Sequence, residues 1–403
     1  MKDNLSCSWM GLELSSPYVI ASLTLVSKVT ITQHVEYYKK AYQMGAGAIV
    51  LPSINPSSKG NREKNNAIAD CLKFYTGLNS KHTMGFTVLG PSEPNIVSID
   101  YGTHLAQEVR KSIPLPIIGS IANIGSDCEV IGAIDALCST GIDGIELNFS
   151  CPNVVNTSTN QTKLTIELLR KIRNKCKLPI SLKITPYMNY SDIICFLDKE
   201  VDGLTLSNAY VGLIPPNIEG DNFSPFDRRT EWSPSGVYGP FERMLTYSHL
   251  YDYHHIASSK GLSIACVGGI VDQDEAIQAI LLGADVVQLS SAILWNGLKA
   301  FEKFNNHLES YMIKRSIFDI KQIKGIALQY IKDCADILDH PIQRTMIVND
   351  KKCMRCDKCS CCDRLCIAIS QKNDRSVVID KDLCSGCKMC YYLCPNSAIE
   401  VRA

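Results

Sequence analysis

Ten of the 19 cysteines gather near the end of the 403-residue chain, between Cys353 and Cys394, and their spacing indicates metal ligation. The most regular run is Cys384-x₂-Cys387-x₂-Cys390-x₃-Cys394-Pro395. Thiolates with this spacing hold four-iron, four-sulfur clusters, because three close cysteines bind one cube and the fourth cysteine binds a second cube. The run therefore predicts an iron–sulfur centre, whose chemistry is one-electron transfer.

A second run with the same spacing precedes the first, and it is Cys356-x₂-Cys359-x₂-Cys362-x₃-Cys366. Two 4Fe-4S clusters are therefore expected, in a small α+β domain of the bacterial ferredoxin type over residues 349–403. The expected ligands of one cluster are Cys356, Cys359, Cys362 and Cys394. Those of the other cluster are Cys384, Cys387, Cys390 and Cys366.

The upstream run leaves alternatives open. Ile367 stands where a proline usually follows, and Cys353 and Cys361 are extra cysteines that could compete as ligands. Zinc also binds paired C-x-x-C motifs, but it needs four thiolates, whereas this segment offers two sets of four in iron–sulfur spacing. Clusters are thus favoured over zinc.

A second group of reactive residues lies in the segment Glu146-Leu-Asn148-Phe-Ser150-Cys151-Pro152-Asn153. The thiol of Cys151, with an ordinary pKa of about 8.5, is mainly protonated at neutral pH and can donate a proton to a substrate. Asn148, Asn153 and Asn208 supply donors and acceptors that recognise the edge of a heterocyclic ring. A single cysteine is more often a buried apolar residue, and a single asparagine a turn residue, so the prediction depends on the whole group.

Eight short apolar runs precede the cysteine-rich segment, at residues 17–21, 48–51, 116–121, 144–148, 180–184, 203–206, 263–267 and 285–289. Apolar residues at helical spacing lie between most of them, as at residues 131–137, 164–172 and 276–282. Eight such βα units predict an α/β fold, a (β/α)₈ TIM barrel over residues 1–315. An open doubly wound sheet would usually carry a G-x-G-x-x-G turn after its first strand, and this sequence has none.

The remaining segments fit around this barrel. Residues 5–14 are expected to form a hairpin at its bottom, and the long connections 53–100 and 209–240 lie where barrel enzymes build their sites. A helix over residues 320–338 is expected inside a helical linker, residues 316–348.

Three features of the barrel are typical of a bound anionic cofactor. Lys183 interrupts an apolar strand, and a charge at a barrel mouth is costly unless something anionic receives it. The pairs Gly268-Gly269 and Ser290-Ser291 offer backbone N–H groups where barrels commonly bind phosphate.

The composition excludes several classes of protein. Hydrophobic residues make up 45% and charged residues 20% of a chain with zero formal net charge, so a folded globular protein is expected, with no basic surface for nucleic acid. No signal peptide or long apolar run is present, so no membrane association is expected. Clustered thiolate ligands favour a reducing, cytoplasmic location over a disulfide framework.

The barrel resembles the family of dihydroorotate and dihydropyrimidine dehydrogenases. The resemblance is carried by residues 146–153 and by the motifs Leu182-Lys183-Ile-Thr-Pro186, Asp202-Gly-Leu-Thr-Leu-Ser-Asn208, Ser235-Gly236-Val-Tyr-Gly239, Val267-Gly268-Gly269-Ile270 and Val287-Gln-Leu-Ser290-Ser291. The C-terminal cysteines are similar to the dihydropyrimidine branch.

The resemblance implies an oxidoreductase that acts on the C5–C6 bond of a pyrimidine, with Cys151 as catalytic residue and FMN as cofactor. It implies substrate contacts at Asn148, Asn153 and Asn208, and Lys183 beside the flavin pyrimidine ring. It also implies cofactor contacts at Ala21, Ser22, Ser53, Asn148, Ser207, Gly236, Gly268, Gly269, Ser290 and Ser291.

Three positions depart from the family. Pro52 stands where these enzymes generally carry a lysine, Ala209 replaces a serine or threonine that adds a substrate hydrogen bond, and Leu23 replaces a glycine. Substrate identity and reaction direction therefore stay open.

The chain has no visible nicotinamide-binding motif, so an external electron carrier is implied, either a ferredoxin or an NAD(P)H-reductase subunit. The sequence leaves open whether the chain forms a homodimer. One alternative is a flavin and iron–sulfur electron-transfer protein that does not turn over a pyrimidine. A tRNA dihydrouridine synthase shares the barrel, but it should display a basic surface that this sequence lacks.

Overall fold

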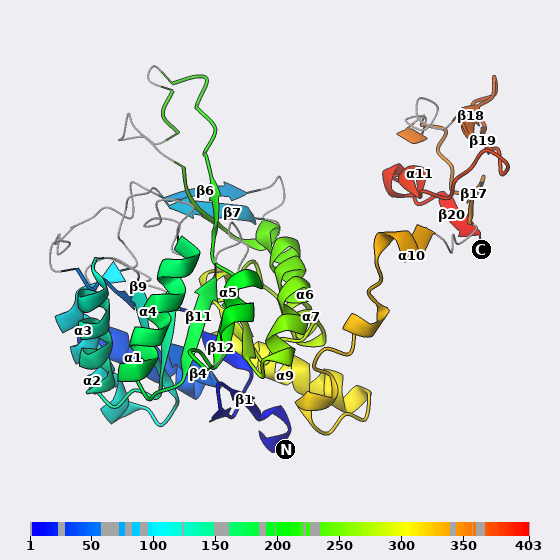
Figure 1. Cartoon of the computed structure of the whole chain (residues 1–403). Coiled ribbons are helices and arrows are strands. Elements are labelled where there is room, and N and C mark those ends of the chain that lie inside the picture. Colours follow the sequence, from blue (N-terminus) through cyan, green and yellow to red (C-terminus); the bar gives the residue numbers. More distant parts are fainter. Residues whose placement is uncertain are drawn as a thin grey trace. The chain divides into compact units, whose positions relative to one another are not determined.

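The computed structural model describes residues 2–22, 29–57, 72–76, 83–88, 96–122, 125–148, 161–184, 191–197, 199–220, 223–225, 234–338, 344–356, 358–359 and 367–402. The chain divides into two compact units, Met1–Gln329 and Tyr330–Ala403 (Figure 1). The division into barrel, linker and cluster domain at residues 316 and 349 stays a prediction.

The first unit is built on a closed ring of parallel strands. In order around the ring these are β3 (Tyr18–Ile20), β4 (Ala48–Val50), β9 (Ile117–Ala122), β10 (Gly144–Asn148), β11 (Ile180–Ile184), β12 (Gly203–Leu206), β15 (Ser263–Cys266) and β16 (Val286–Leu289). The pairing of Val287 with Tyr18 joins the last strand to the first. The predicted eight-stranded TIM barrel is confirmed, and each strand lies within its predicted run except β9, which extends one residue further to Ala122.

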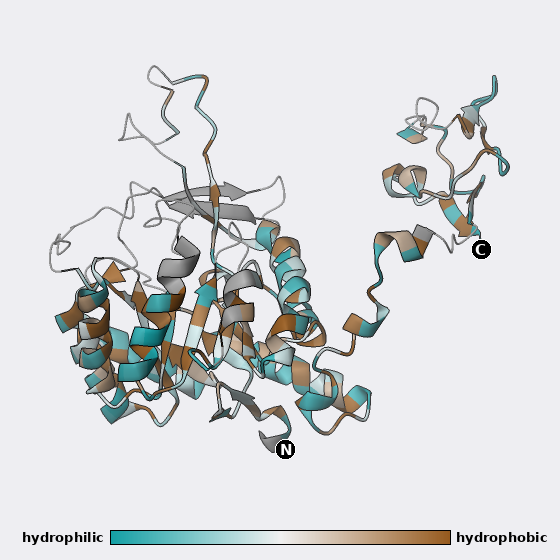
Figure 2. Ribbon diagram, in the orientation of Figure 1, coloured by the Kyte–Doolittle hydropathy of each residue, from teal (hydrophilic) through white to brown (hydrophobic). Residues whose placement is uncertain are grey.

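Helices cover the outside of the ring. They are α1 (Ile31–Gln43), α2 (Ile99–Ser112), α3 (Asp127–Cys138), α4 (Gln161–Lys175), α5 (Ser191–Phe196), α6 (Arg243–Ser259), α7 (Gln273–Leu281), α8 (Ser291–Asn296) and α9 (Lys299–Lys314). Capping boxes start α1, α3 and α7, because a Thr, Ser or Asp side chain bonds the third helical N–H and a Gln or Glu bonds back. The three predicted helical stretches fall on α3, α4 and α7. Figure 2 shows apolar residues along the strands and polar residues on the outer helix faces.

A hairpin closes the bottom of the barrel, as predicted. After η1 (Lys2–Leu5), strand β1 (Cys7–Trp9) pairs with β2 (Leu12–Leu14) through a turn in which Met10 and Gly11 have φ of 54° and 76°. Two positive φ values in succession are typical of a two-residue hairpin turn. Trp9 is fully buried, and the Met10 N–H donates to Ser263 Oγ at 3.0 Å, which fixes the hairpin to the start of β15.

The two long connections meet in one antiparallel sheet. The first contains β5 (Ser53–Ile54), β6 (Leu72–Thr76), β7 (Thr83–Val88) and β8 (Ile96–Val97), and the second contains β13 (Tyr210–Gly212) and β14 (Ser235–Tyr238). Strands from both connections assemble in the order β13-β14-β7-β6. Figure 1 shows β6 and β7 over one end of the barrel. The sequence predicts the two connections but not their pairing.

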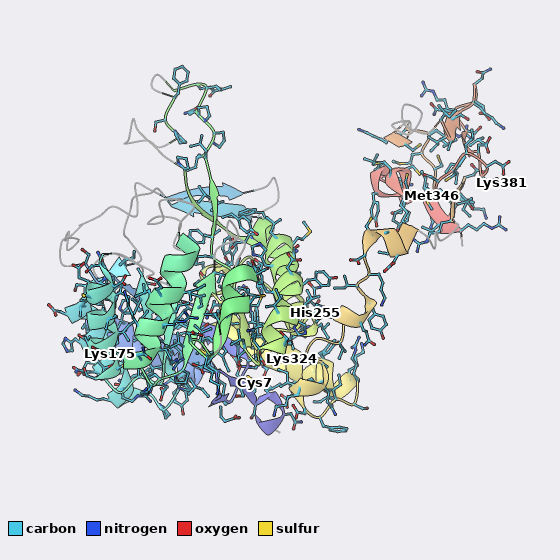
Figure 3. All side chains as sticks on the ribbon, viewed as in Figure 1. Cys7, Lys175, His255, Lys324, Met346 and Lys381 are labelled. Atoms are coloured by element: carbon cyan, nitrogen blue, oxygen red, sulfur yellow. The ribbon has the colours of Figure 1, made fainter. Side chains whose placement is uncertain are left out.

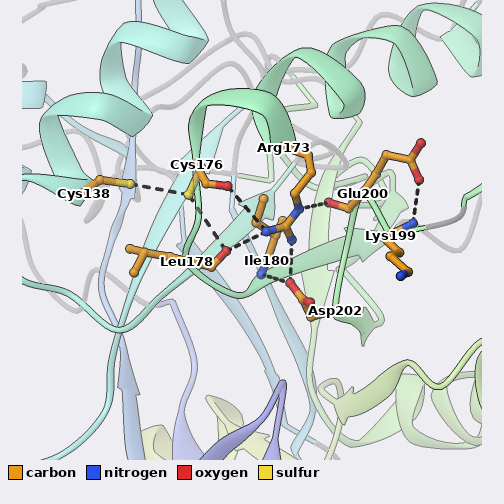
Figure 4. A network of polar contacts seen from close by, with 8 residues as sticks. All are labelled: Cys138, Arg173, Cys176, Leu178, Ile180, Lys199, Glu200 and Asp202. Carbon is orange, nitrogen blue, oxygen red and sulfur yellow. Dashed lines mark hydrogen bonds and ion pairs between the residues drawn. The ribbon is translucent and has the colours of Figure 1, made fainter.

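Arg173, in the last turn of α4, organises the opposite end of the barrel (Figure 4). Its guanidinium donates to the backbone carbonyls of Leu178 and Glu200 and to the Asp202 carboxylate. Asp202 also accepts from the Ile180 N–H at 2.8 Å, so one ion pair links the starts of β11 and β12.

Two free thiols adjoin this network. Cys138 at the end of α3 and Cys176 lie with their Sγ atoms 3.5 Å apart. The hydrogen bond from Cys138 lowers the pKa of Cys176 to about 7 and raises the pKa of Cys138.

The segment after α9 differs from its prediction. A continuous helix over residues 320–338 is wrong, because the chain forms η4 (Ile320–Gln322), η5 (Leu328–Tyr330) and α10 (Cys334–Leu338). Gly325 has a φ of 72° and its N–H donates to the Ile280 carbonyl at the end of α7. A residue with a left-handed backbone conformation, whose N–H bonds to another element, ends a helix. Apolar spacing alone therefore gave the wrong prediction.

The second unit is a small α+β domain. Strand β17 (Thr345–Val348) pairs with β20 (Ile399–Arg402), and β18 (Ile369–Gln371) pairs with β19 (Val377–Ile379), both antiparallel, with α11 (Met389–Leu393) before β20. Its core contains Met346, which Figure 3 labels, together with Ile369, Val377, Cys390 and Ile399. This architecture agrees with the predicted ferredoxin-like domain.

None of the helices in the described ranges combines the length and apolar character needed to cross a membrane.

Candidate active site and cluster ligands

A continuous chain of polar side chains crosses the mouth of the barrel, where the strands end. Ser53 Oγ lies 3.2 Å from Ser22 Oγ and 2.8 Å from Ser120 Oγ, and it accepts from Asn148 Nδ2 at 3.1 Å. Asn208 Nδ2 then donates to Asn148 Oδ1 at 2.9 Å. Four side chains predicted as cofactor or substrate contacts therefore lie together in space, although 186 positions separate the first from the last.

A buried charge pair lies beside this chain. Lys183 pairs with Asn148 in the register of β10 and β11, and its Nζ is 3.6 Å from Glu146 Oε1. The Glu146 side chain is fully buried, and its Oε2 accepts from Thr205 Oγ1 at 3.0 Å and Gln288 Nε2 at 2.7 Å. Sequence reasoning gave Glu146, Thr205 and Gln288 no role. A sequence signal was available, because all three are polar residues inside apolar strands. Glu146 also lies two residues before Asn148, so its side chain is on the same face of the strand.

Replacing Lys183 by methionine should lower the free energy of unfolding by about 3–5 kcal/mol, because the change leaves a buried carboxylate without its cation. The double variant Lys183→Met/Glu146→Gln should recover most of that loss. Urea unfolding followed by tryptophan fluorescence measures both. Lys171→Met, which removes an exposed ion pair to Asp127, is the control and should change stability little. Equal losses in the single and double variants would show that the pair is not coupled.

The glycine turn after β15 packs against the start of α6. Gly268 has a φ of 131° and a Cβ there would lie 2.5 Å from Thr246 Oγ1, while a Cβ at Gly269 would lie 2.5 Å from the Arg243 backbone N. Both positions therefore require glycine for packing, whatever else they contact. Ser290 directly precedes α8, and Ser291 is its buried first residue. Both follow β16, the strand that pairs with β15.

A buried carboxyl group lies under this turn. Glu242, in η3 (Pro240–Glu242), is 2% exposed, and burial raises its pKa to about 8, although N–H groups of Gly239 and Gly269 bond to it and lower the pKa. The Gly269 N–H is thus engaged by Glu242. Glu242 Oε2 and Thr246 Oγ1 have no hydrogen-bond partner among the described residues. These two orphaned polar atoms suit a bound polar group or water near Gly268.

The raised pKa of Glu242 predicts a pH-dependent stability. Above an unfolded pKa of 4.5 the unfolded chain loses its proton while the folded chain keeps it, so stability falls as pH rises from 4.5 to about 8. At about 1.4 kcal/mol per pH unit, the loss approaches 5 kcal/mol. Glu242→Gln should remove this slope in urea unfolding measured across that window. The exposed Glu219→Gln should keep the slope, and a slope that persists in Glu242→Gln would contradict the assignment.

The other predicted cofactor contacts lie at strand ends. The Ala21 N–H donates to the Leu289 carbonyl between β3 and β16, and the Ser207 N–H donates to Val267 between β12 and β15. Gly236 lies in β14 opposite Val211, and a Cβ there would approach the Ala209 side chain at 3.4 Å. Gly239, which the prediction did not include, lies closer to the glycine turn, because its carbonyl oxygen would be 2.9 Å from a Cβ at Gly269.

Four predicted site residues lie outside the described residues, namely Cys151, Asn153, Cys362 and Cys366. Their roles stay predictions.

The described cysteines between residues 353 and 394 form two groups. Cys384 and Cys387 lie between β19 and α11, and Cys390 lies in α11 as part of the small core. Cys353, Cys356, Cys359 and Cys394 line one hollow together with apolar residues such as Val348 and Ile399. Burial, together with the nearby Cys353, Cys394 and Cys356, raises the pKa of Cys359 to about 11.

Within the described part of the chain, no three His, Cys, Asp or Glu side chains lie close enough to hold a single metal ion. A tetrahedral zinc ion draws four thiolates to about 2.3 Å from one point, whereas the thiolates of a cube bind four separate irons.

Comparison with known proteins agrees with this geometry. A family model described as dihydroorotate dehydrogenase matches residues 6–312, and one described as a 4Fe-4S binding domain matches residues 377–400. The chain is similar to proteins named dihydroorotate dehydrogenase B (NAD(+)), catalytic subunit. It is 24% identical over 330 residues to that of Thermoplasma volcanium, with 81% of this chain and 99% of that protein covered. It is 25% identical over 336 residues to that of Methanothermobacter thermautotrophicus, covering 80% and 98%.

The chain therefore belongs to the dihydroorotate dehydrogenase family, an FMN-binding family of oxidoreductases that act on CH–CH groups. A 4Fe-4S ferredoxin domain follows its barrel.

Proposed function

We propose that the protein exchanges two electrons between FMN and the C5–C6 bond of a pyrimidine, and that two 4Fe-4S clusters carry them singly to an external partner. The polar chain from Ser22 through Ser53 and Asn148 to Asn208 is the observation that carries this proposal. It gathers amide donors and acceptors on one side of a barrel mouth, next to the Lys183 cation. A planar ring with alternating carbonyl and N–H groups matches such a surface.

The residues of the chain would divide the work. FMN, when bound, supplies hydride acceptance and donation. Cys151 would exchange the proton at C5, and Asn148, Asn153 and Asn208 would hold the ring edge. Lys183, held by Glu146 at 3.6 Å, would keep a positive charge beside the flavin pyrimidine ring.

The phosphate of FMN would lie over Gly268 and the start of α8. Gly268, Ser290 and Ser291 provide backbone N–H groups at the ends of β15 and β16, and barrels commonly bind phosphate at this place. The unpartnered Thr246 Oγ1 next to Gly268 supports a polar occupant there. Because Glu242 holds the Gly269 N–H and favours its protonated form, it would add little repulsion at neutral pH.

Pro52 decides which pyrimidine is favoured. It lies two residues after β4 and is buried, and it provides no cation for a ring carboxylate. A neutral ring is therefore the proposed substrate class in preference to one with a carboxylate. The curated relatives are named for dihydroorotate, so the two classes must be compared directly.

The electron partner is proposed to be a ferredoxin or an NAD(P)H-reductase subunit. Relatives named as the catalytic subunit of an NAD(+) enzyme support a separate protein that handles the nicotinamide. Thiolate-ligated clusters also support a cytoplasmic, reducing location.

Anaerobic titration of the protein in both flavin oxidation states tests this function. Uracil, thymine and orotate are added in turn to the photoreduced protein, and their dihydro forms to the oxidised protein, while flavin absorbance is followed. One pyrimidine should reoxidise the flavin, and its dihydro form should reduce it. Flavin that responds to none of the six compounds would contradict pyrimidine chemistry and favour the alternative of an electron-transfer protein.

A further inference from the structure

The hollow beside β17 contains one more cysteine than the predicted ligand run assigns to it. Its lining includes Cys353, Cys356, Cys359 and Cys394. Of these, Cys353 stands outside the predicted ligand sets, as an extra cysteine that could compete as a ligand. The domain has two cysteine loops, one after β17 and one after β19. The described backbone indicates which three cysteines of the first loop correspond to Cys384, Cys387 and Cys390 of the second.

The two halves of the domain enter their cysteine loops in the same way. The Cys353 N–H donates to the Asn349 carbonyl at 3.0 Å, and the Cys384 N–H donates to the Asp380 carbonyl, also at 3.0 Å. Each of these carbonyl residues also caps its own loop. Asn349 Oδ1 accepts from the backbone N–H of Lys351, and Asp380 Oδ1 accepts from the backbone N–H of Asp382, in each case two residues further on.

The strands before the loops repeat as well. Asn349 directly follows β17 and its N–H donates to the Ala398 carbonyl at 2.7 Å. Asp380 directly follows β19 and its N–H donates to the Ala368 carbonyl at 2.7 Å. The two loops therefore start at equivalent points of two related strand pairs.

The backbone conformation inside the loops gives the same register. Arg355, before Cys356, has a φ of 56°, and Gly386, before Cys387, has a φ of 70°. A left-handed residue is unfavourable for arginine, so its presence there marks a required turn rather than a preference of the residue. In the predicted register Arg355 would be the equivalent of Leu383, which does not have a positive φ.

The fourth cysteine that lines the hollow, Cys394, comes from the downstream cysteine run. Cys394 precedes Pro395, and its Sγ accepts from the Ala398 N–H at 3.2 Å. Backbone N–H groups aimed at sulfur stabilise thiolate ligands of iron–sulfur clusters. Cys394 thus lines the same hollow as the three upstream cysteines and can supply the fourth ligand.

We infer that Cys353, Cys356, Cys359 and Cys394 ligate one 4Fe-4S cluster, and that Cys353 takes the place predicted for Cys362 in it. The upstream run is shifted by three residues from Cys356-x₂-Cys359-x₂-Cys362 to Cys353-x₂-Cys356-x₂-Cys359. The second cluster keeps Cys384, Cys387 and Cys390, with Cys366 as its fourth ligand. This inference rests on the proposed two-cluster function and deepens it.

Single alanine variants of the full chain, prepared without oxygen, test the register through their iron and sulfide content. Wild-type protein should hold about eight irons. Cys353→Ala should fall to about four, because one cluster loses a ligand, whereas Cys362→Ala should keep all of them. Cys334→Ala, an exposed cysteine in α10, is the control for loss of a thiol. Full iron in Cys353→Ala with half in Cys362→Ala would overturn the inference.

Alkylation of the wild-type holoprotein gives a second measurement that needs no variant to fold. Cluster ligands are protected from iodoacetamide until the cluster is removed. Trypsin cleaves after Lys352, Arg355 and Lys358, so Cys353 and Cys362 fall on different peptides. We expect Cys353 to be protected and Cys362 to be alkylated, and the reverse pattern would overturn the shift. Wild-type protein without iron would contradict the two-cluster function itself, which distinguishes that failure from a wrong register.

Discussion

Cys151→Ser should lower turnover of the pyrimidine substrate roughly a hundred- to ten-thousand-fold while FMN stays bound, because a hydroxyl is a much weaker acid than a thiol and gives up its proton far less readily. The FMN contacts proposed for Lys183, Gly268 and Ser291 do not involve the thiol, so flavin content should not change. Steady-state rates and flavin content of the same preparation measure both effects.

Cys195→Ser is the matched control, because it makes the same chemical change at an exposed thiol of the barrel. It should leave turnover and flavin content as in the wild type. If Cys151→Ser also keeps its rate, Cys151 has no role in proton transfer, and the protein would be better described as a flavin and iron–sulfur electron carrier.

Removal of residues 349–403 should abolish electron transfer to a ferredoxin or reductase subunit and spare reduction of a dye that takes electrons from the flavin directly. The clusters are the only one-electron relay proposed for this chain, and without them electrons remain at the flavin. Rates with both acceptors, measured on the same protein, separate chemistry at the barrel from relay through the clusters.

A full-length variant that lacks one cluster is the control, because it separates the loss of a cluster from the removal of the whole segment 349–403. Cys387→Ala should remove a ligand of the second cluster and also stop transfer to the protein carrier, with the dye rate preserved. Undiminished transfer to the protein carrier after either change would refute the relay.

The barrel was predictable because its strands are buried on both faces. Such strands appear as short apolar runs, and the helices between them have their own apolar period. The segment 320–338 was not predictable in this way, since Gly325 turns left-handed to bond the end of α7, and that contact is invisible in apolar spacing. The pairing of β7 with β14 joins two loops that are far apart in sequence, and no local signal marks it.

The mouth of the barrel was predictable from polar residues at strand ends, and Ser22, Ser53, Asn148 and Asn208 do lie together. Glu146 was quoted as part of a motif, but its pairing with Lys183 depends on the register of neighbouring strands. The carboxyl of Glu242 under the glycine turn also needed the structure, because its sequence neighbours give no sign of burial. Cysteine spacing alone favoured Cys362, whereas the backbone bonds of Asn349 and Asp380 favour Cys353.

The most direct test of the whole account is electron paramagnetic resonance of the oxidised, anaerobic protein frozen after addition of the dihydropyrimidine that reduces its flavin. Electrons that leave the ring should appear as the signal of reduced 4Fe-4S clusters, and the signal should be absent in Cys151→Ser frozen at the same time. A bleached flavin with both clusters still oxidised, or clusters reduced at the wild-type rate in Cys151→Ser, would contradict it.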